Sequence, residues 1–519
     1  MIAFLLGPGL DFATWVLGSL AAIALLTYHP YLGLAAAILG GAWLGVSRPL
    51  LSEEEASDLQ GQVQKEQKEE RPPSGGKYPG RALLLLAKAA ARWVADYEPL
   101  FLLAAMPLLI FPGHLTRVAL AFIAVLWLCR WAGRGSITVR TPLDVPIWGL
   151  LMMLPVTLYA SADWSLTLPK LYGILLSAAV FYAIANAARS EERLWFMVSL
   201  FILAGLGMAG LSLVGTDWKS HKLFALPQVY ARLPRLISGL TRSPQGGFHP
   251  NEVGGMLTLF VPLLVSLIIP WRDREGDRSK RQQGRLWQRF WDPHSRLFQA
   301  GLMGALVGIG FTFLLTQSRS SFIGVAIALM VLGILRSRWF CLGIPAVVLA
   351  TILAVQRLGM ERLGDLLFML EATGTMRGRM EVWQRAIYMI QDFPFTGIGL
   401  GTFDIVRNAL YPLFLAGPDV QIFHAHNLLL QVAVDLGMPG LVTYAGLIAA
   451  FALMGCQVYQ SRGGREKALA AGLLCGMLAH QVYGLTDTVA LGSKPGFLVW
   501  GMLGLMAGLY AYPTPSGDH

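Results

Sequence analysis

Apolar segments of about twenty residues recur along most of the chain, and shorter charged segments separate them. Each apolar segment is long enough to cross a hydrocarbon core of about 30 Å as a helix. A helix also satisfies its own backbone hydrogen bonds, which lipid cannot do. The pattern predicts an all-α polytopic integral membrane protein. We expect about fourteen transmembrane helices, near residues 10–27, 31–46, 98–111, 114–131, 143–160, 168–188, 193–214, 250–270, 298–316, 320–336, 339–356, 438–459, 468–487 and 496–512.

The distribution of Lys and Arg predicts how these helices are oriented. Segment 271–296 carries eight basic and four acidic residues, and such an excess favours the cytoplasmic side. Alternation from that segment places the other basic connections inside as well, and an even number of spans leaves both termini inside. Two long connections, 215–249 and 357–437, then face the outside.

The same pattern divides the chain into five regions. Residues 1–47 supply two N-terminal transmembrane helices, an addition to a twelve-span core, and residues 48–97 form a charged cytoplasmic linker with an interfacial helix. Residues 98–356 form the transmembrane bundle, 357–437 a large, partly helical external loop, and 438–519 the C-terminal transmembrane helices. A loop of that length is usually functional, so we expect the site there.

Composition agrees with a membrane location and excludes several kinds of site. Hydrophobic residues make up 55% and charged residues 14% of the chain, against about 45–50% and about 25% in soluble domains. The four cysteines have no C-x-x-C spacing, so neither a zinc site nor a disulfide framework is indicated. The stretch "GIGLGTF" (397–403) follows no strand and lacks the lysine of a phosphate-binding loop. It predicts a tight turn under a helix, not nucleotide binding.

Basic residues in the external connections are candidates for binding an anion. The first connection contains five of them against one acid, Asp217. Either an external anionic ligand or lipid headgroups would explain these residues. The five are Lys219, Lys222, Arg232, Arg235 and Arg242.

Two further arginines stand at helix ends in the same external zone. The stretch "LLTQSRSSFIG" puts Arg319 between two apolar helices, with Ser318 and other serines beside it. An ionisable residue there is a functional candidate, favoured over simple contact with headgroups. Arg379 begins an amphipathic helical face in the long external loop, close to Arg377.

The stretch "RSPQGGFHPNEVGGM" (242–256) leads into a predicted span at Pro250. Its polar residues His249, Asn251 and Glu252 have two interpretations. They cap the helix that follows, or they face a cavity. Capping is the favoured interpretation because they directly precede or begin the apolar segment.

The stretch "HAHNLLLQVAVDLGMPG" (424–440) holds two of the nine histidines of the chain, at the mouth of an apolar segment. His424 and His426 have three interpretations. They could ligate a metal, although no third ligand is evident nearby; they could be ordinary interfacial residues; or one could be a general base, given a reference pKa of about 6.5. Taken alone, the pair favours the interfacial interpretation.

Together, these stretches resemble the O-antigen ligase and O-antigen polymerase superfamily between about residues 235 and 459. The most specific element is His426-Asn427, nine residues, then Gly437-x-x-Gly440. The other matching elements, in the same order as in the family, are Arg242…Gly247-Phe248-His249-Pro250-Asn251, Ser318-Arg319, Arg379-x3-Trp383 and Asp392-x-Pro394-x2-Gly397-x-Gly399.

The resemblance implies a membrane glycosyltransferase acting on the external, periplasmic face of the bacterial inner membrane. The implied donor is a glycan on an undecaprenyl diphosphate carrier. A ligase would move this glycan to the lipid A core, and a polymerase would move it to another carrier-linked repeat. The implied partners are these lipid-linked glycans, the acceptor and membrane lipids. No metal, cofactor, nucleotide or nucleic acid is implied.

The resemblance also implies roles for individual residues. His426 is the matched candidate for the base, with His424 as the alternative. Arg319 and Arg379 are the best candidates for the cations that stabilise the leaving diphosphate, because arginine donates in pairs and stays charged. A single displacement with inversion follows as a hypothesis. The further substrate-binding candidates are Arg377, Arg242, His424, Asn427, His249, Asn251 and Ser318.

Two rival functions remain open at this point. A protein O-oligosaccharyltransferase would share the motifs and differ only in its acceptor. A transporter of lipid-linked oligosaccharides would need polar residues inside many spans, whereas the polar motifs here gather at the outer ends.

Overall fold

The computed structural model describes residues 79–110, 116–216, 218, 227–233, 248–271, 295–343, 352–353, 356–357, 359, 376–415 and 420–511. These residues are mainly helical, and the only β pairing among them is one isolated bridge between Thr216 and Phe248. The α-helices are α4 (Pro79–Asp96), α5 (Glu98–Ile110), α6 (Thr116–Arg134), α7 (Asp144–Ala160), α8 (Trp164–Ala187), α9 (Glu191–Gly215), α10 (Pro227–Tyr230), α11 (Pro250–Leu257), α12 (Phe260–Ile268), α14 (Arg296–Thr316), α15 (Arg319–Arg336), α18 (Met376–Asp392), α19 (Phe403–Leu410), α20 (Leu428–Ser461), α21 (Gly464–Gly484) and α22 (Phe497–Ala511).

Seven helical segments within the described residues are long and apolar enough to cross a membrane. They are α6, α8, α9, α11 with α12, α14, α15 and α20, and the apolar α7 is shorter. The all-α membrane protein expected from the sequence is therefore confirmed. The predicted count of fourteen stays a prediction. The spans expected at 10–27 and 31–46, and most of the one at 339–356, lie outside the described residues.

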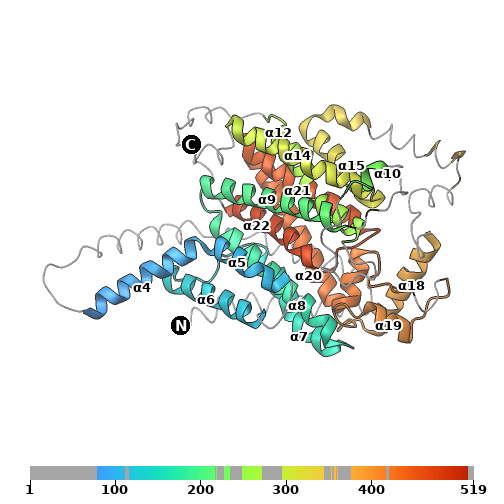
Figure 1. The fold of residues 1–519 in the computed structure, drawn as a ribbon, viewed down its shortest axis with the longest axis horizontal. Coiled ribbons are helices and arrows are strands. Elements are labelled where there is room, and N and C mark those ends of the chain that lie inside the picture. Colours follow the sequence, from blue (N-terminus) through green and yellow to red (C-terminus); the bar gives the residue numbers. More distant parts are fainter. Residues whose placement is uncertain are drawn as a thin grey trace.

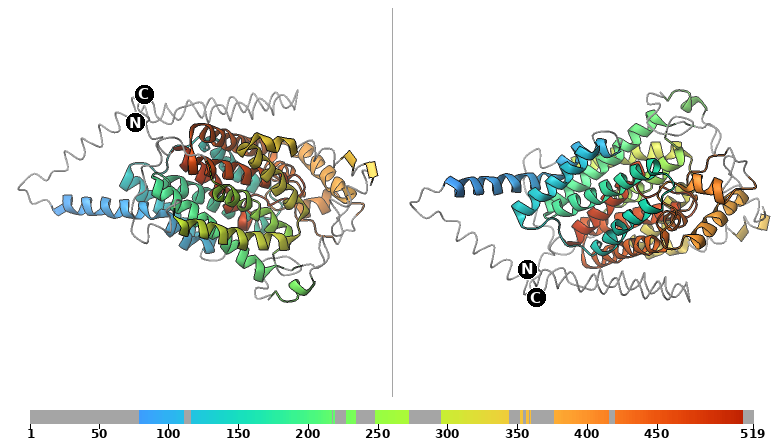
Figure 2. Two further views of the ribbon diagram at one scale, coloured as in Figure 1. Left: turned by 90° about the horizontal axis from the view of Figure 1, so that it is seen from above. Right: turned by 90° about the horizontal axis from the view of Figure 1, so that it is seen from below.

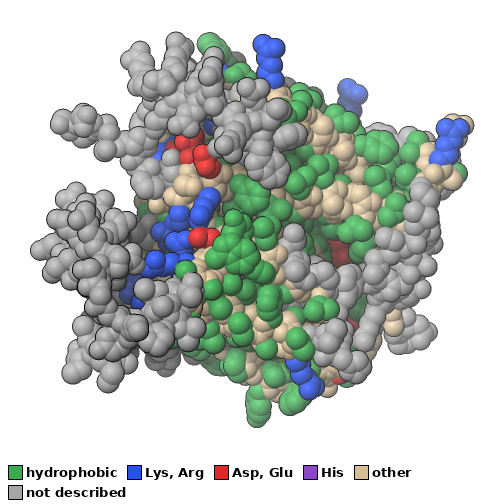
Figure 3. All heavy atoms as spheres, turned by 60° about the vertical axis from the view of Figure 1, so that its left-hand side comes forward, with side chains coloured by type: hydrophobic (Ala, Val, Ile, Leu, Met, Phe, Trp, Pro, Cys, Tyr) green, Lys and Arg blue, Asp and Glu red, His purple; other side chains and the backbone are tan. Residues whose placement is uncertain are grey.

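The helices form one bundle with α20, α21 and α22 running through it (Figure 1; Figure 2). Large side chains such as Phe181, Phe260 and Phe451 are fully buried between these helices. Other apolar side chains point outward, including Val125 of α6 and Val307 of α14, which are 51% and 66% exposed. Figure 3 shows such hydrophobic side chains spread over one face. An outward apolar surface is what lipid contact requires.

The predicted span at 250–270 consists of two helices, α11 and α12, with a turn at Thr258–Leu259 between them. Thr258 donates its hydroxyl to the carbonyl of Gly255 at 2.6 Å, which satisfies one of the carbonyls at the end of α11. The short α11 packs against α14 and α15. Its first turn therefore lies beside the start of α15, where Arg319 stands.

Helix α4 packs along α6. It lies in the region predicted as linker and interfacial helix, of which the structure describes residues 79–97. The Arg92 Nε atom donates to the carbonyl of Gly133 at 3.0 Å. Asp96, at the end of α4, forms ion pairs with Arg134 of α6 and Arg193 of α9. The predicted helix is present, and its lying along the membrane interface stays a prediction.

Helix α20 begins at Leu428, ten residues before the span predicted at 438–459. It contains one break at Gly437, whose φ of 69° and ψ of −177° are not helical. The predicted span corresponds to the part after this break. The part before it carries the histidine stretch toward α18 and α19, which lie together at one end of the bundle (Figure 1).

Candidate active site

The histidine stretch forms a turn that is fixed to the start of α20. Asn427 caps this helix by accepting the amide of Leu430 at 3.0 Å on its Oδ1 atom. Its Nδ2 atom donates to the carbonyl of Leu485 at 2.9 Å. His426 adopts a φ of 49°, in the left-handed region. A side chain held there costs of the order of 1–3 kcal/mol and marks a position that its surroundings determine.

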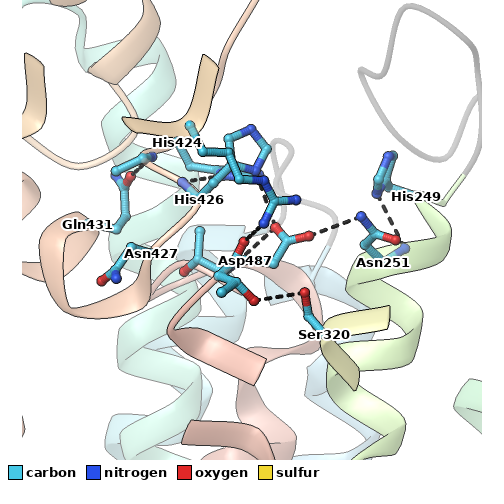
Figure 4. A network of polar contacts seen from close by, with 12 residues as sticks. His249, Asn251, Ser320, His424, His426, Asn427, Gln431 and Asp487 are labelled. Atoms are coloured by element: carbon cyan, nitrogen blue, oxygen red, sulfur yellow. Dashed lines mark hydrogen bonds and ion pairs between the residues drawn. The ribbon is translucent and has the colours of Figure 1, made fainter. Parts of the chain in front are cut away.

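His426 faces the carboxylate of Asp487, which follows α21 (Figure 4). The His426 Nδ1 atom lies 3.4 Å from Asp487 Oδ1. Asn251 of α11 donates to Asp487 Oδ2 at 3.0 Å, and the Thr488 amide donates to Oδ1 at 2.9 Å. Asp487 is 3% exposed, so these donors replace the water that a carboxylate requires. One carboxylate thus joins α11, α21 and the histidine turn.

The electrostatics favour a charged Asp487 beside neutral His424. Burial alone would raise the pKa of Asp487, but the hydrogen bond and charge of His426, together with His424 and Arg379, hold it well below its usual range. Burial lowers the pKa of His424 well below its ordinary value, and the neighbouring His426 adds to this. The two imidazole rings meet edge to face with centroids 4.3 Å apart. His426 is therefore the histidine that the carboxylate orients.

Arg379 reaches the same place from α18, which belongs to the predicted external loop. Its side chain is 8% exposed and donates to the backbone carbonyl of Thr486. The Thr486 hydroxyl in turn donates to Ser320 at 2.8 Å. Ser320 follows Arg319 in the first turn of α15. The residue before Asp487 thus connects the segments that carry the two predicted cations.

The start of α15 is shaped by the turn before it. Gln317 is fully buried and adopts a φ of 47°, which ends α14 in a left-handed residue. Ser318 is 1% exposed and accepts the Ser321 hydroxyl at 2.9 Å. A buried, hydrogen-bonded Ser318 serves the turn that presents Arg319. Its role in binding substrate stays a prediction.

The capping interpretation of the stretch before α11 is confirmed for His249. Its Nδ1 atom accepts the Asn251 amide at 3.3 Å and caps the helix. Asn251 does more than occupy the first turn, because its side chain binds Asp487. The structure thus brings His424, His426, Asn427, Asn251 and Arg379 around one loop, 485–488.

Two predicted substrate-binding residues are not placed in this site. Arg242 lies outside the described residues. Arg377 lies in the first turn of α18, and its side chain also lies outside what the structure describes. Both stay predictions from the resemblance.

Comparison with known families agrees with this geometry. Residues 304–445 match the family described as O-antigen ligase. This segment, about a quarter of the chain, is therefore similar to that family. The matched segment contains Arg319, Arg379, His424 and His426, whereas Asp487, Asn251 and Arg242 lie outside it. No curated protein matched the chain.

Sequence reasoning missed three charged residues near this site. Asp487 was missed because it is the last residue of a predicted span and lies 61 residues after His426. Lys170 of α8 lies close enough to act electrostatically on His424, on Glu252 of α11 and on Asp435 of α20. Lys170 stands inside the span predicted at 168–188, and an ionisable residue within a predicted span is the signal that could have found it. Asp435 lies in the predicted external loop, so that signal does not apply to it.

The glycine-rich turn packs under a helix, as the sequence predicted, and it meets α20 at the break. The Ile398 amide donates to the Val434 carbonyl at 2.8 Å, and the Met438 amide donates to the Pro394 carbonyl at 2.7 Å. A Cβ atom on Gly397 would lie 2.6 Å from the Val434 oxygen, and one on Gly437 would lie 2.7 Å from the Phe395 carbonyl carbon. Both glycines also have positive φ angles. The two glycine motifs of the family therefore pair with each other.

The sequence showed no third metal ligand near the histidines, and the structure supplies a candidate for it in Asp487. Ligand atoms of His424, His426 and Asp487 all lie within 4.8 Å of one another. Several of these atoms already take part in hydrogen bonds: His424 Nδ1 accepts the His426 amide at 3.3 Å, and Asn251 occupies Asp487 Oδ2. The same group of residues also makes a histidine–carboxylate pair, which is what a general base needs.

Proposed function

We propose that this protein is a membrane glycosyltransferase that moves a glycan from an undecaprenyl diphosphate carrier to an acceptor hydroxyl on the external face of the cytoplasmic membrane. The observation that carries this proposal is the His426–Asp487 contact, with Arg379 bound to the residue before Asp487. The O-antigen ligase domain supports the class of reaction.

The histidine–carboxylate pair activates the acceptor. With Nδ1–H directed at Asp487, the Nε2 atom of His426 carries the lone pair that accepts a proton. It takes the proton of the acceptor hydroxyl as that oxygen attacks the anomeric carbon. The new glycosidic bond forms while the bond from the anomeric carbon to the diphosphate oxygen breaks. Asp487 stabilises the imidazolium that results.

The arginines act on the other product, the lipid diphosphate, which takes the electron pair of the broken bond. Its negative charge increases as the bond breaks, so cations fixed beforehand stabilise the transition state more than the ground state. Arg379 and Arg319 supply them. Their guanidinium groups present paired donors that match phosphate oxygens.

The acceptor distinguishes the members of this class. In a ligase the acceptor is the lipid A core, in a polymerase a second carrier-linked repeat, and in a protein O-oligosaccharyltransferase a protein hydroxyl. A strain lacking this protein tests all three. The expected results are, respectively, a lipid A core without its long glycan, glycans one repeat long, and protein without glycan. Unchanged glycans on lipid and protein would contradict the proposal.

A transporter of lipid-linked oligosaccharides is distinguished by reconstitution. Purified protein in proteoliposomes with lipid-linked glycan and acceptor should form a covalently glycosylated acceptor and free undecaprenyl diphosphate. Movement of intact donor between leaflets without either product would favour transport.

A further inference from the structure

Two buried polar residues of α20 lie directly behind the histidine turn. Gln431 and Asp435 are each 1% exposed and stand four residues apart on one helix face. Neither touches Asp487 or an arginine through any described hydrogen bond. Burying a polar side chain costs free energy unless it forms hydrogen bonds. The hydrogen-bond partners of these two residues therefore indicate their function.

The Gln431 side chain bridges the helix and the turn. Its Oε1 atom accepts the amide of Ala425, the residue between the two histidines, at 2.6 Å. Its Nε2 atom donates to Asp435 Oδ1 at 2.9 Å. Figure 4 shows Gln431 beside the histidine turn, on the side away from Asn251. A carboxylate only accepts, so Asp435 determines which end of the Gln431 amide faces Ala425.

Asp435 is itself fixed by the rest of the domain. The Thr157 hydroxyl of α7 donates to the Asp435 backbone carbonyl at 3.0 Å and accepts the Leu400 amide at 3.0 Å. The Gly401 amide also hydrogen-bonds its side chain, and Lys170 of α8 acts on it electrostatically. The glycine-rich turn and α7 thus fix Asp435, the residue to which Gln431 donates.

The hydrogen bonds that run from Asp435 through Gln431 end at Ala425, next to the strained backbone of His426. Ala425 directly precedes His426, whose φ is 49°. The amide of Ala425 is held by Gln431, the amide of His426 by His424, and the side chain of Asn427 by Leu485. Three successive residues are thus fixed, which keeps the His426 ring directed at Asp487.

We infer that Gln431 and Asp435 are positioning residues that set the His426 imidazole for proton transfer. This inference rests on the proposed function of His426 as the base. Loss of the bridge lets the turn relax, and the ring then leaves the orientation that Asp487 requires. A displacement of about 1 Å costs on the order of 100-fold in rate.

Substitutions of Gln431 test the bridge. Gln431→Glu keeps the size of the side chain but replaces its donor by a second carboxylate facing Asp435, and Gln431→Leu removes both hydrogen bonds. We expect kcat for glycan transfer to fall by about 100-fold in each, with KM for the lipid-linked donor changed by less than about 2-fold, because the arginines that bind it are untouched. Gln457→Leu, at an exposed position of the same helix, is the matched control and should keep both constants.

Conservative replacement and a double mutant keep the inference testable if these variants fold poorly. Asp435→Asn retains an oxygen for Gln431 and should keep most of the activity, whereas Asp435→Leu should not. In a His426→Ala background, Gln431→Leu should reduce the residual rate no further, because both act through one group. Equal losses in both backgrounds, or a normal kcat for Gln431→Leu, would overturn the inference. Full activity of His426→Ala would instead overturn the proposed function.

Discussion

The guanidinium group of Arg379 donates to the backbone carbonyl of Thr486, the residue immediately before Asp487. A cation from the segment predicted to be external is therefore joined to the loop that carries the carboxylate facing His426. Their shared anchor is the short loop after α21.

Replacement of His426 is the most direct test of the mechanism. His426→Ala should lower glycan transfer by about 10²- to 10⁴-fold, the usual contribution of a general base. The thermal midpoint in detergent should change little, since the side chain is partly exposed. The control is His424→Ala under the same assay. If His424→Ala abolishes transfer while His426→Ala does not, the roles of the two histidines are reversed.

Asp487→Asn tests whether the carboxylate acts through His426. The amide has one oxygen, so either His426 or Asn251 loses its acceptor. We expect kcat to fall by at least about 10-fold, less than for His426→Ala, because the imidazole remains but its protonated form loses its partner. Steady-state kinetics at several pH values measure this. An unchanged rate would separate Asp487 from catalysis.

The arginines should act as paired donors and not as charge alone. Arg319→Lys and Arg379→Lys should each impair transfer, and alanine should impair it more, because lysine keeps the charge but loses the planar fork. Arg385→Lys is the matched control for Arg379. It lies on the same helix and binds the Pro412 carbonyl and Glu381, away from the site. Full activity of Arg379→Lys would show that Arg379 contributes only its positive charge and not paired hydrogen bonds.

Chelation distinguishes a general-base role of the histidine–carboxylate group from a metal-binding role. Transfer by purified protein should survive excess EDTA, because His426 and the arginines account for both proton transfer and charge stabilisation. Assays before and after dialysis against EDTA measure this directly. Loss of activity that Mg²⁺, Mn²⁺ or Zn²⁺ restores would assign His424, His426 and Asp487 to a metal instead.

The break in α20 should tolerate no side chain. Gly437→Ala combines a positive φ with a Cβ atom 2.7 Å from the Phe395 backbone, so it should destabilise the fold by roughly 1–3 kcal/mol. Gly446→Ala, on the same helix, meets only the Pro146 side chain at 3.9 Å and should be neutral or slightly stabilising. Thermal unfolding in matched detergent measures both. Equal midpoints for the two variants would contradict the pairing of the glycine motifs.

Local features of the site were predictable from the sequence because they depend on neighbouring residues. The capping role of His249 and the turn in the glycine-rich stretch are both of this kind. The beginning of α20 was placed ten residues late, because Gly437 and Pro439 resemble a helix start although the helix only bends there.

Contacts between distant segments could not be predicted in this way. Asp487 meets His426 only because α21 returns the chain to the end of the bundle where α20 begins. In the sequence it looks like the last residue of an apolar span. Lys170 likewise reads as one charge within α8, and only folding brings it near His424. Each required knowledge of which helix ends lie together.

The break at Gly437 also limits how this chain can exchange segments with similar proteins. The Val434 carbonyl and the Met438 amide, which a continuous helix would pair internally, are satisfied by residues 394–398 instead. A graft that replaced the external segment but stopped before α20 would leave these two polar groups facing a foreign turn. Chimaeras that aim to alter the acceptor should therefore carry residues 376–438 as a single block, joined within the regular helix that follows.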